Sequence, residues 1–172
     1  CRTKGVVINS PNNPSGVVYT EETLRGLAVL LERKSAEYGH PIYIIADEPY
    51  RELVYGDVTV PFIPCLYRNT IVCYSYSKSL SLPGERIGYV YVPGFADDSA
   101  AVYAAVSGAA RVMGHVCPPT LMQKVIQLCA GERPDLAAYD ENRNLLYNSL
   151  REMGYECAKP DGAFYLFVKA PN

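Results

Sequence analysis

Residues 75–88 read SYSKSLSLPGERIG, and they begin within an apolar run, Thr70 to Tyr76, that predicts a buried strand. The end of a strand holds a side chain in a fixed place, and Lys78 stands there. Lysine forms Schiff bases with carbonyl compounds, while hydroxyl groups and arginine bind phosphate. Serines on both sides of Tyr76, and Arg86 further along, supply those groups. The stretch predicts an imine-forming lysine beside a phosphate site, against the alternative of an ordinary solvated lysine.

The composition is that of a folded domain, or of a domain with part of another. The chain has 172 residues, 49% of them apolar, which is too many for a disordered protein. Lys and Arg total 16 against 18 Asp and Glu, and without a basic stripe we expect no nucleic-acid partner. Apolar runs are too short to cross a membrane. The sequence lacks an initiator methionine and stops after a strand-like run, so we expect an excerpt of a longer polypeptide.

The cysteines predict neither a metal site nor a disulfide framework. None of the six forms a C-x-x-C pair, and only two histidines are available as further ligands. Cys73 and Cys129 lie in apolar segments, where reduced cysteine acts as a small hydrophobic residue. Reduced cysteines favour a cytoplasmic location. The six are Cys1, Cys65, Cys73, Cys117, Cys129 and Cys157.

The first part of the chain predicts a βαβ unit. A short apolar run, Gly5 to Asn9, is followed by a Pro/Asn/Gly turn and then by a helix capped at Thr20. A second apolar run, Ile42 to Ala46, shows no alternation, as in a strand covered on both faces. Two strands joined through a helix are expected to be parallel, and ligands bind outside the carboxyl ends of such strands. Asn13 and Asp47 lie just past two of these ends, as Lys78 does past a third.

The rest of the chain predicts an antiparallel strand, three helices and part of a second domain. The link from Lys78 to a strand at Arg86 to Val92 is too short for a crossover helix, so this strand is expected to be antiparallel. Helices are expected near 100–112, capped by 97–99, near 120–129, and up to Met153. Strands are expected at 155–157 and 163–168. The fold class is α/β, a three-layer, mostly parallel sheet with one antiparallel strand, followed by the start of a small α+β domain. The expected domains are residues 1–131 and 132–172.

A pyridoxal phosphate ring would need the groups that surround Lys78 in this prediction. A carboxylate beside the pyridine nitrogen makes the ring a better electron sink, and Asp47 is the candidate. Tyr50 and Asn13 would both contact the phenolic oxygen and stabilise its anion. The alternatives are a turn aspartate and a packing tyrosine, one of 15 in the chain.

Four motifs give the chain a resemblance to a known family. They are NPSG at 13–16, DEPY at 47–50, the lysine stretch at 75–88, and PDGAFY at 160–165. In this order they resemble the class I and II aminotransferases, the aspartate aminotransferase family of pyridoxal-phosphate enzymes of fold type I. The resemblance covers essentially the whole chain, as the later part of the large, cofactor-binding domain, a linking helix and the start of the small domain.

The resemblance implies an enzyme that moves an amino group between an amino acid and a 2-oxo acid, as a homodimer in its full-length form. Lys78 would be catalytic and would hold pyridoxal 5′-phosphate as a Schiff base. Ser77 has no firm role in the family. The other cofactor-binding residues implied are Asp47 for the pyridine nitrogen, Asn13 and Tyr50 for the phenolic oxygen, and Ser75 and Arg86 for the phosphate.

Departures from the family pattern bear on activity. The Gly-rich phosphate loop, the aromatic residue that stacks on the ring and the arginine for the substrate α-carboxylate have no counterpart here. We therefore expect the 172-residue chain alone to be inactive. Arg111 lies 33 residues after Lys78, one position from where one branch of the family reads a distal carboxylate. The alternative for Arg111 is a helix-end charge that balances the dipole.

Two other functions stay open from the sequence. A carbon–sulfur lyase on the same fold needs the same lysine, aspartate and arginine. An aminotransferase-like sensor domain of a transcription regulator would also keep them.

Overall fold

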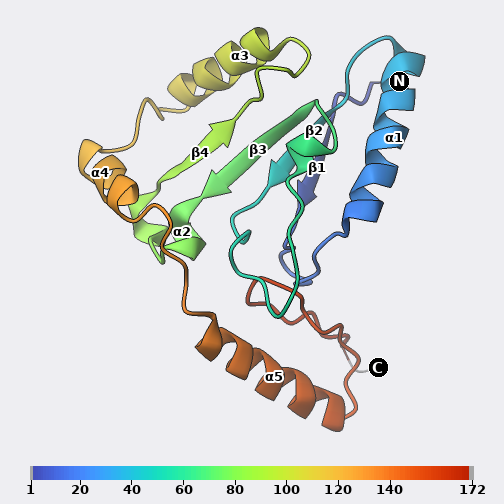
Figure 1. Cartoon of the computed structure of the whole chain (residues 1–172), viewed down its shortest axis with the longest axis vertical. Coiled ribbons are helices and arrows are strands. Elements are labelled where there is room, and N and C mark those ends of the chain that lie inside the picture. Colours follow the sequence, from blue (N-terminus) through green and yellow to red (C-terminus); the bar gives the residue numbers. More distant parts are fainter. Residues whose placement is uncertain (1, 171–172) are drawn as a thin grey trace.

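The computed structural model describes residues 2–170, and its centre is a four-stranded mixed sheet with the order β1-β2-β3-β4 (Figure 1). The first three strands are parallel, and β4 is antiparallel to β3. The predicted mixed sheet, with its antiparallel last strand, is therefore confirmed. The strands are β1 (Gly5–Asn9), β2 (Tyr43–Asp47), β3 (Thr70–Ser75) and β4 (Gly88–Tyr91).

The helices follow the predicted order, with short helical turns added around the lysine stretch. One of these turns is η2 (Pro83–Glu85). Another short turn, η1 (Ile63–Cys65), lies earlier in the chain, before β3. The α-helices are α1 (Glu21–Tyr38), α2 (Tyr76–Ser79), α3 (Ser99–Val112), α4 (Thr120–Leu128) and α5 (Leu136–Glu152).

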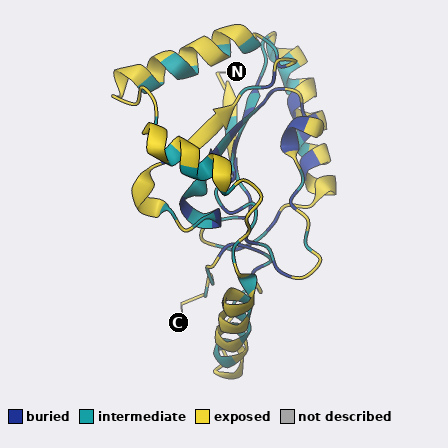
Figure 2. Ribbon diagram, turned by 60° about the vertical axis from the view of Figure 1, so that its left-hand side comes forward, coloured by how far each residue is buried: buried dark blue, intermediate teal, exposed yellow. Residues whose placement is uncertain are grey.

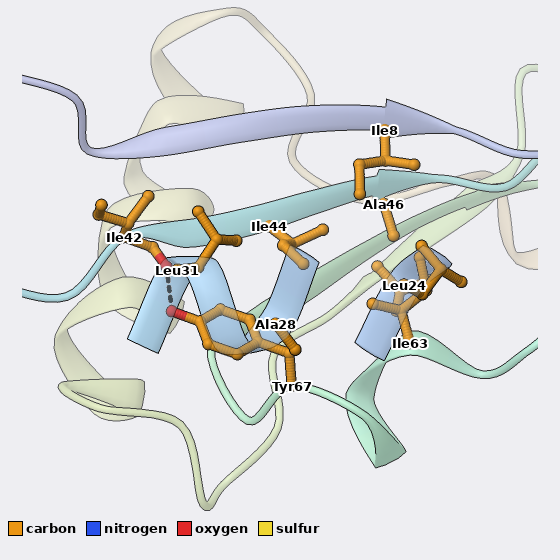
Figure 3. Packing of buried hydrophobic residues seen from close by; sticks show 10 residues of the cluster. Ile8, Leu24, Ala28, Leu31, Ile42, Ile44, Ala46, Ile63 and Tyr67 are labelled. Atoms are coloured by element: carbon orange, nitrogen blue, oxygen red, sulfur yellow. Dashed lines mark hydrogen bonds between the residues drawn. The ribbon is translucent and has the colours of Figure 1, made fainter. Parts of the chain in front are cut away.

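Helix α1 has the caps that its sequence predicts. The Thr20 hydroxyl accepts a hydrogen bond from the Thr23 N–H at 3.2 Å. At the other end Gly39 takes φ 70° and donates to the Ser35 carbonyl, a left-handed cap that suits glycine. One helix face is buried, and Figure 3 shows it against β2; its residues are Leu24, Ala28 and Leu31.

The main hydrophobic core lies between α1 and the sheet (Figure 3). Ile44 and Ala46 of β2 are fully buried there, and the Tyr67 hydroxyl donates to the Ile42 carbonyl at 2.6 Å. Alternate residues of β2, among them Asp47, are only half-buried. In the strand expected to be covered on both faces, α1 thus covers one face more completely than the other face is covered. Asp47 consequently projects from the face away from the core.

The cap predicted for α3 is also different. Asp98 is the N-cap residue, but it has φ 51° and makes no side-chain capping bond. The Asp97 carboxylate instead forms an ion pair with Arg68 at 3.2 Å and accepts a hydrogen bond from Asn69 at 2.9 Å. It is therefore bound by residues distant in sequence and does not cap α3. These contacts fix the start of α3 to the loop before β3.

The strands predicted after α5 do not form. The two predicted ranges, 155–157 and 163–168, share one isolated bridge, between Cys157 and Val168. A second isolated bridge joins Gly162, just before the later range, to Val54. The backbone N–H groups of Asp161 and Gly162 both donate to the Gly16 carbonyl at 2.9 Å. This segment therefore pairs partly with itself, through the Cys157–Val168 bridge, and partly with loops of the sheet domain.

Helices α3, α4 and α5 have no fully buried residue, whereas α1 has a buried face (Figure 2). Tyr89 and Val90 of β4 are likewise 48% and 45% exposed. No helix within residues 2–170 is both long and apolar enough to span a membrane. Cys65 and Cys117 are exposed free thiols, Cys73 and Cys129 are half-buried as small hydrophobic residues, and Cys1 lies outside the described residues.

Candidate active site

Three parallel strands end at one edge of the sheet, and the predicted site residues follow from those ends. Asn9 at the end of β1 is in register with Asp47 at the end of β2, and Asp47 is in register with Cys73 of β3. Helix α2 begins directly after β3 and carries Lys78 in its single turn. The convergence predicted from the strand ends is therefore present.

Lys78 is half-buried above two aromatic rings. Its Nζ lies 5.3 Å from the ring centroid of Phe164 and 6.0 Å from that of Tyr50. Ser75 caps α2 by accepting from the Ser77 N–H at 3.2 Å, and it donates to the Ser77 hydroxyl at 2.8 Å. The serines therefore fix the turn that carries Lys78 and lie next to it.

Asp47 is the acidic group of the site. Burial raises the pKa of its carboxyl above the ordinary value. The Asn9 Nδ2 donates to the Asp47 carbonyl at 2.9 Å and to its carboxylate at 3.2 Å. Within residues 2–170 no lysine or arginine forms an ion pair with this carboxylate. It is therefore a partly desolvated acid able to receive a cationic N–H.

Tyr50 is buried, at 5% exposure, and its hydroxyl lies 2.6 Å from that of Tyr165. Burial first, and then the bond to Tyr165, raise the pKa of Tyr50 well above its ordinary value. A hydrogen bond from the Asn13 side chain acts in the opposite direction. Asn13 itself is exposed, and its N–H donates to the Asn9 Oδ1 at 2.6 Å.

Arg86 is exposed, and its Nη1 donates to the Pro83 carbonyl at 2.9 Å. Its backbone has φ 51°. Together with Arg111 it lines an open groove of about 1040 Å³ beside β4 and α3. The structure thus brings Asn13, Asp47, Tyr50 and Lys78 into one cluster, and it places Arg86 on the groove instead.

Sequence reasoning missed two groups of site residues. In the sequence Asn9 is only the last residue of an apolar strand, and the signal that could have found it is its place beside Asp47, at the end of a neighbouring parallel strand. In the sequence Phe164 and Tyr165 stand out only as part of a family motif, because no neighbouring residue indicates that they contact Tyr50. Their contacts with Tyr50 are T-shaped ring pairs at 5.5 and 5.6 Å.

The family model for aminotransferase class I and II matches residues 1–172. Among curated relatives, the aspartate aminotransferase of Thermotoga maritima is 36% identical over 179 residues, covering 98% of this chain and 42% of the relative. That of Geobacillus stearothermophilus is 32% identical, with the same coverage of both chains. The chain therefore spans about 42% of the length of these relatives.

Solved structures agree with this assignment. A crystal structure of an amino transferase from Eubacterium rectale has a TM-score of 0.95 and 64% identity, and the match covers 98% of this chain and 42% of that one. A crystal structure of aspartate aminotransferase from Thermotoga maritima has a TM-score of 0.76 and 31% identity, over 99% and 43% of the two chains. By sequence and by fold, this chain belongs to the class I and II aminotransferases.

Proposed function

We propose that the full-length protein is a pyridoxal-phosphate-dependent aminotransferase that moves an amino group between an amino acid and a 2-oxo acid. The observation that carries the proposal is the placement of Lys78 over the rings of Tyr50 and Phe164, at the sheet edge where the half-buried Asp47 lies. The amine lies in the turn of α2 after β3, and the partly desolvated carboxylate ends the neighbouring β2; the two are complementary to the aldehyde and the pyridine nitrogen of this cofactor. When bound, pyridoxal phosphate supplies an aldehyde that condenses with amines and a ring that withdraws electrons.

The residues of the cluster have separable tasks. Lys78 would provide both the amine that holds the cofactor and the base that moves the substrate's α-proton. Asp47 keeps a proton on the ring nitrogen by charge attraction. Tyr50 and Asn13 donate to the anionic ring oxygen.

Ser75 and Arg86 are proposed to bind the phosphate. Ser75 already lies at the start of the turn that carries Lys78. Arg86 uses one guanidinium N–H on the Pro83 carbonyl, and a guanidinium has five donors, so the others are available for a planar contact with phosphate oxygens.

The whole protein is proposed to be a cytoplasmic homodimer in which residues 1–131 belong to the large domain and residues 132–172 begin the small one. The cysteine pattern and the family support this assignment. Because the chain spans about 42% of its relatives, we expect the isolated 172 residues to bind the cofactor weakly and to turn nothing over. Ready transamination by the isolated chain, with cofactor absorbance following turnover, would contradict this expectation.

The test of the function is a screen of amino donors and 2-oxo acids with the full-length enzyme. Wild type should need a 2-oxo acid for turnover, and the Lys78→Ala variant should lose it. The exposed Lys159, changed to Ala, is the matched control and should keep it. Release of ammonia without any 2-oxo acid would indicate a lyase and would contradict the proposed aminotransferase function.

A further inference from the structure

Tyr165 contacts Tyr50 in the cluster around Lys78, and it has no role in the proposed function above. Its hydroxyl oxygen lies 2.6 Å from that of Tyr50, and the two rings meet edge to face with centroids 5.6 Å apart. The residues are 115 positions apart in sequence, so no local turn requires this contact. Two hydroxyls that meet in a half-buried place form a bond whose direction either partner can set.

The segment that carries Tyr165 is held firmly against the sheet domain. Asp161 and Gly162 donate to the Gly16 carbonyl, and Ala163 donates to the Leu53 carbonyl at 2.8 Å. A Cβ on Gly162 would lie 2.8 Å from the Leu53 oxygen, a spacing that only glycine allows. The position of the Tyr165 hydroxyl is therefore set by backbone contacts rather than by a free loop.

The two partners of Tyr50 act on it in opposite ways. The bond with Asn13 favours an ionised Tyr50, whereas the bond with Tyr165 favours the neutral form, as when Tyr50 donates to Tyr165. A hydroxyl has one proton to donate. If Tyr50 turns its proton toward an anionic ligand oxygen, its own oxygen becomes free to accept from Tyr165.

We propose that Tyr165 is a positioning residue for Tyr50. The hydrogen bond between the two hydroxyls reverses its direction when Tyr50 donates to the anionic ring oxygen of the cofactor, so that Tyr165 then donates to Tyr50. By donating to Tyr50, Tyr165 polarises the Tyr50 O–H and strengthens its bond to that oxygen. The inference rests on the proposed cofactor, and it gives the segment after α5 a role in the chemistry of the sheet domain.

The experiment uses the full-length holoenzyme and measures how the visible absorbance of the bound cofactor depends on pH. The Tyr165→Phe variant should shift the midpoint of this titration upward by roughly 0.3–1 pH unit. The reason is that weaker donation from Tyr50 leaves more charge on the ring oxygen, which then retains a nearby proton to higher pH. Tyr139→Phe removes a hydroxyl from the same aromatic cluster, where Tyr139 stacks on Phe164, and should titrate as wild type.

Two further variants separate positioning from packing. Replacing Tyr165 with 3-fluorotyrosine makes the hydroxyl a better donor at nearly constant size, so the midpoint should move downward. In a Tyr50→Phe background, Tyr165→Phe should add no shift, because its effect passes through the Tyr50 hydroxyl.

The failures are distinguishable. If wild type shows no cofactor absorbance and no turnover, the proposed function is wrong and this inference fails with it. Two results with a normally titrating wild type would overturn the positioning role alone. In the first, Tyr165→Phe has the same midpoint as wild type. In the second, Tyr165→Phe shifts the midpoint as much in the Tyr50→Phe background as it does in wild type.

Discussion

The side chain of Asn9 joins the ends of β1 and β2 by donating to the Asp47 carboxylate at 3.2 Å. It also donates to the Asp47 carbonyl at 2.9 Å and accepts from the Asn13 N–H at 2.6 Å. One side chain thus orients both the acid proposed for the ring nitrogen and the loop that carries a donor for the ring oxygen. Asparagine can do this because its amide offers donors and an acceptor together.

The Asn9→Ala variant tests this orienting role. Loss of a hydrogen bond to a carboxylate in a half-buried place is expected to cost about 1–2 kcal/mol, or roughly a tenfold weaker affinity for pyridoxal phosphate. Titration of the full-length apoenzyme with the cofactor measures this. Asn148→Ala, an exposed asparagine of α5, is the control. Equal affinities for Asn9→Ala and wild type would remove Asn9 from the site.

Asp47 gives a prediction with a defined pH dependence. Burial raises its pKa in the folded state, so the folded protein binds this proton more tightly than the unfolded chain does. The ionised carboxylate therefore costs stability above the raised pKa, and this cost fades as the pH falls through it.

The Asp47→Asn variant of the apoenzyme should consequently melt at a higher temperature than wild type at pH 7, and the gap should narrow toward pH 4. Its kcat/KM should fall at least about 100-fold, because an amide does not stabilise a proton on the ring nitrogen by charge. Thermal melts across this pH range and steady-state kinetics check the two halves separately. A melting gap that widens toward acid would contradict the assigned cause.

Much of the large-domain fold could be predicted from the chain because its signals are local. The caps of α1 at Thr20 and Gly39, the apolar strands and the short link to β4 each depend on neighbouring residues only. From parallel strands followed the convergence of Asn13, Asp47 and Lys78 at one edge. These are the residues on which the family motifs also fall.

What the sequence could not predict depends on distant partners. Asp97 does not cap α3 as expected, because its carboxylate binds Arg68 and Asn69, which lie close to it only in the folded chain. The segment after α5 has strand-like composition, yet its backbone pairs with Gly16 and Leu53. Strand propensity alone does not determine the pairing partner, and so the contact of Tyr165 with Tyr50 stayed hidden.

Gly88 is predicted to be essential to the pairing that supports the lysine turn. It lies opposite Ser75 in the register of β3 and β4, and a Cβ there would come within 2.2 Å of the Tyr74 carbonyl oxygen. Gly88→Ala should therefore destabilise the full-length protein by at least about 2 kcal/mol, measured by urea unfolding. Gly94→Ala, where an added Cβ would have no atom of the described residues within 4 Å beyond its chain neighbours, should stay near wild type. Similar midpoints for the two variants would contradict the steric argument.

The Arg111→Leu variant tests whether this side chain recognises the second carboxylate of a dicarboxylic substrate or only balances the dipole of α3. Arg111 lies exposed in the last turn of α3 and lines the groove that Arg86 also lines, so its guanidinium is available to an anion there. In the full-length enzyme, Arg111→Leu should lower kcat/KM for aspartate by roughly 10- to 100-fold and leave that for alanine nearly unchanged, because only aspartate loses an ionic partner. Arg151→Leu, which removes an arginine from the last turn of α5, controls for loss of a helix-end charge and should affect neither substrate. An equal loss on aspartate and alanine would instead indicate that Arg111 only balances the helix dipole.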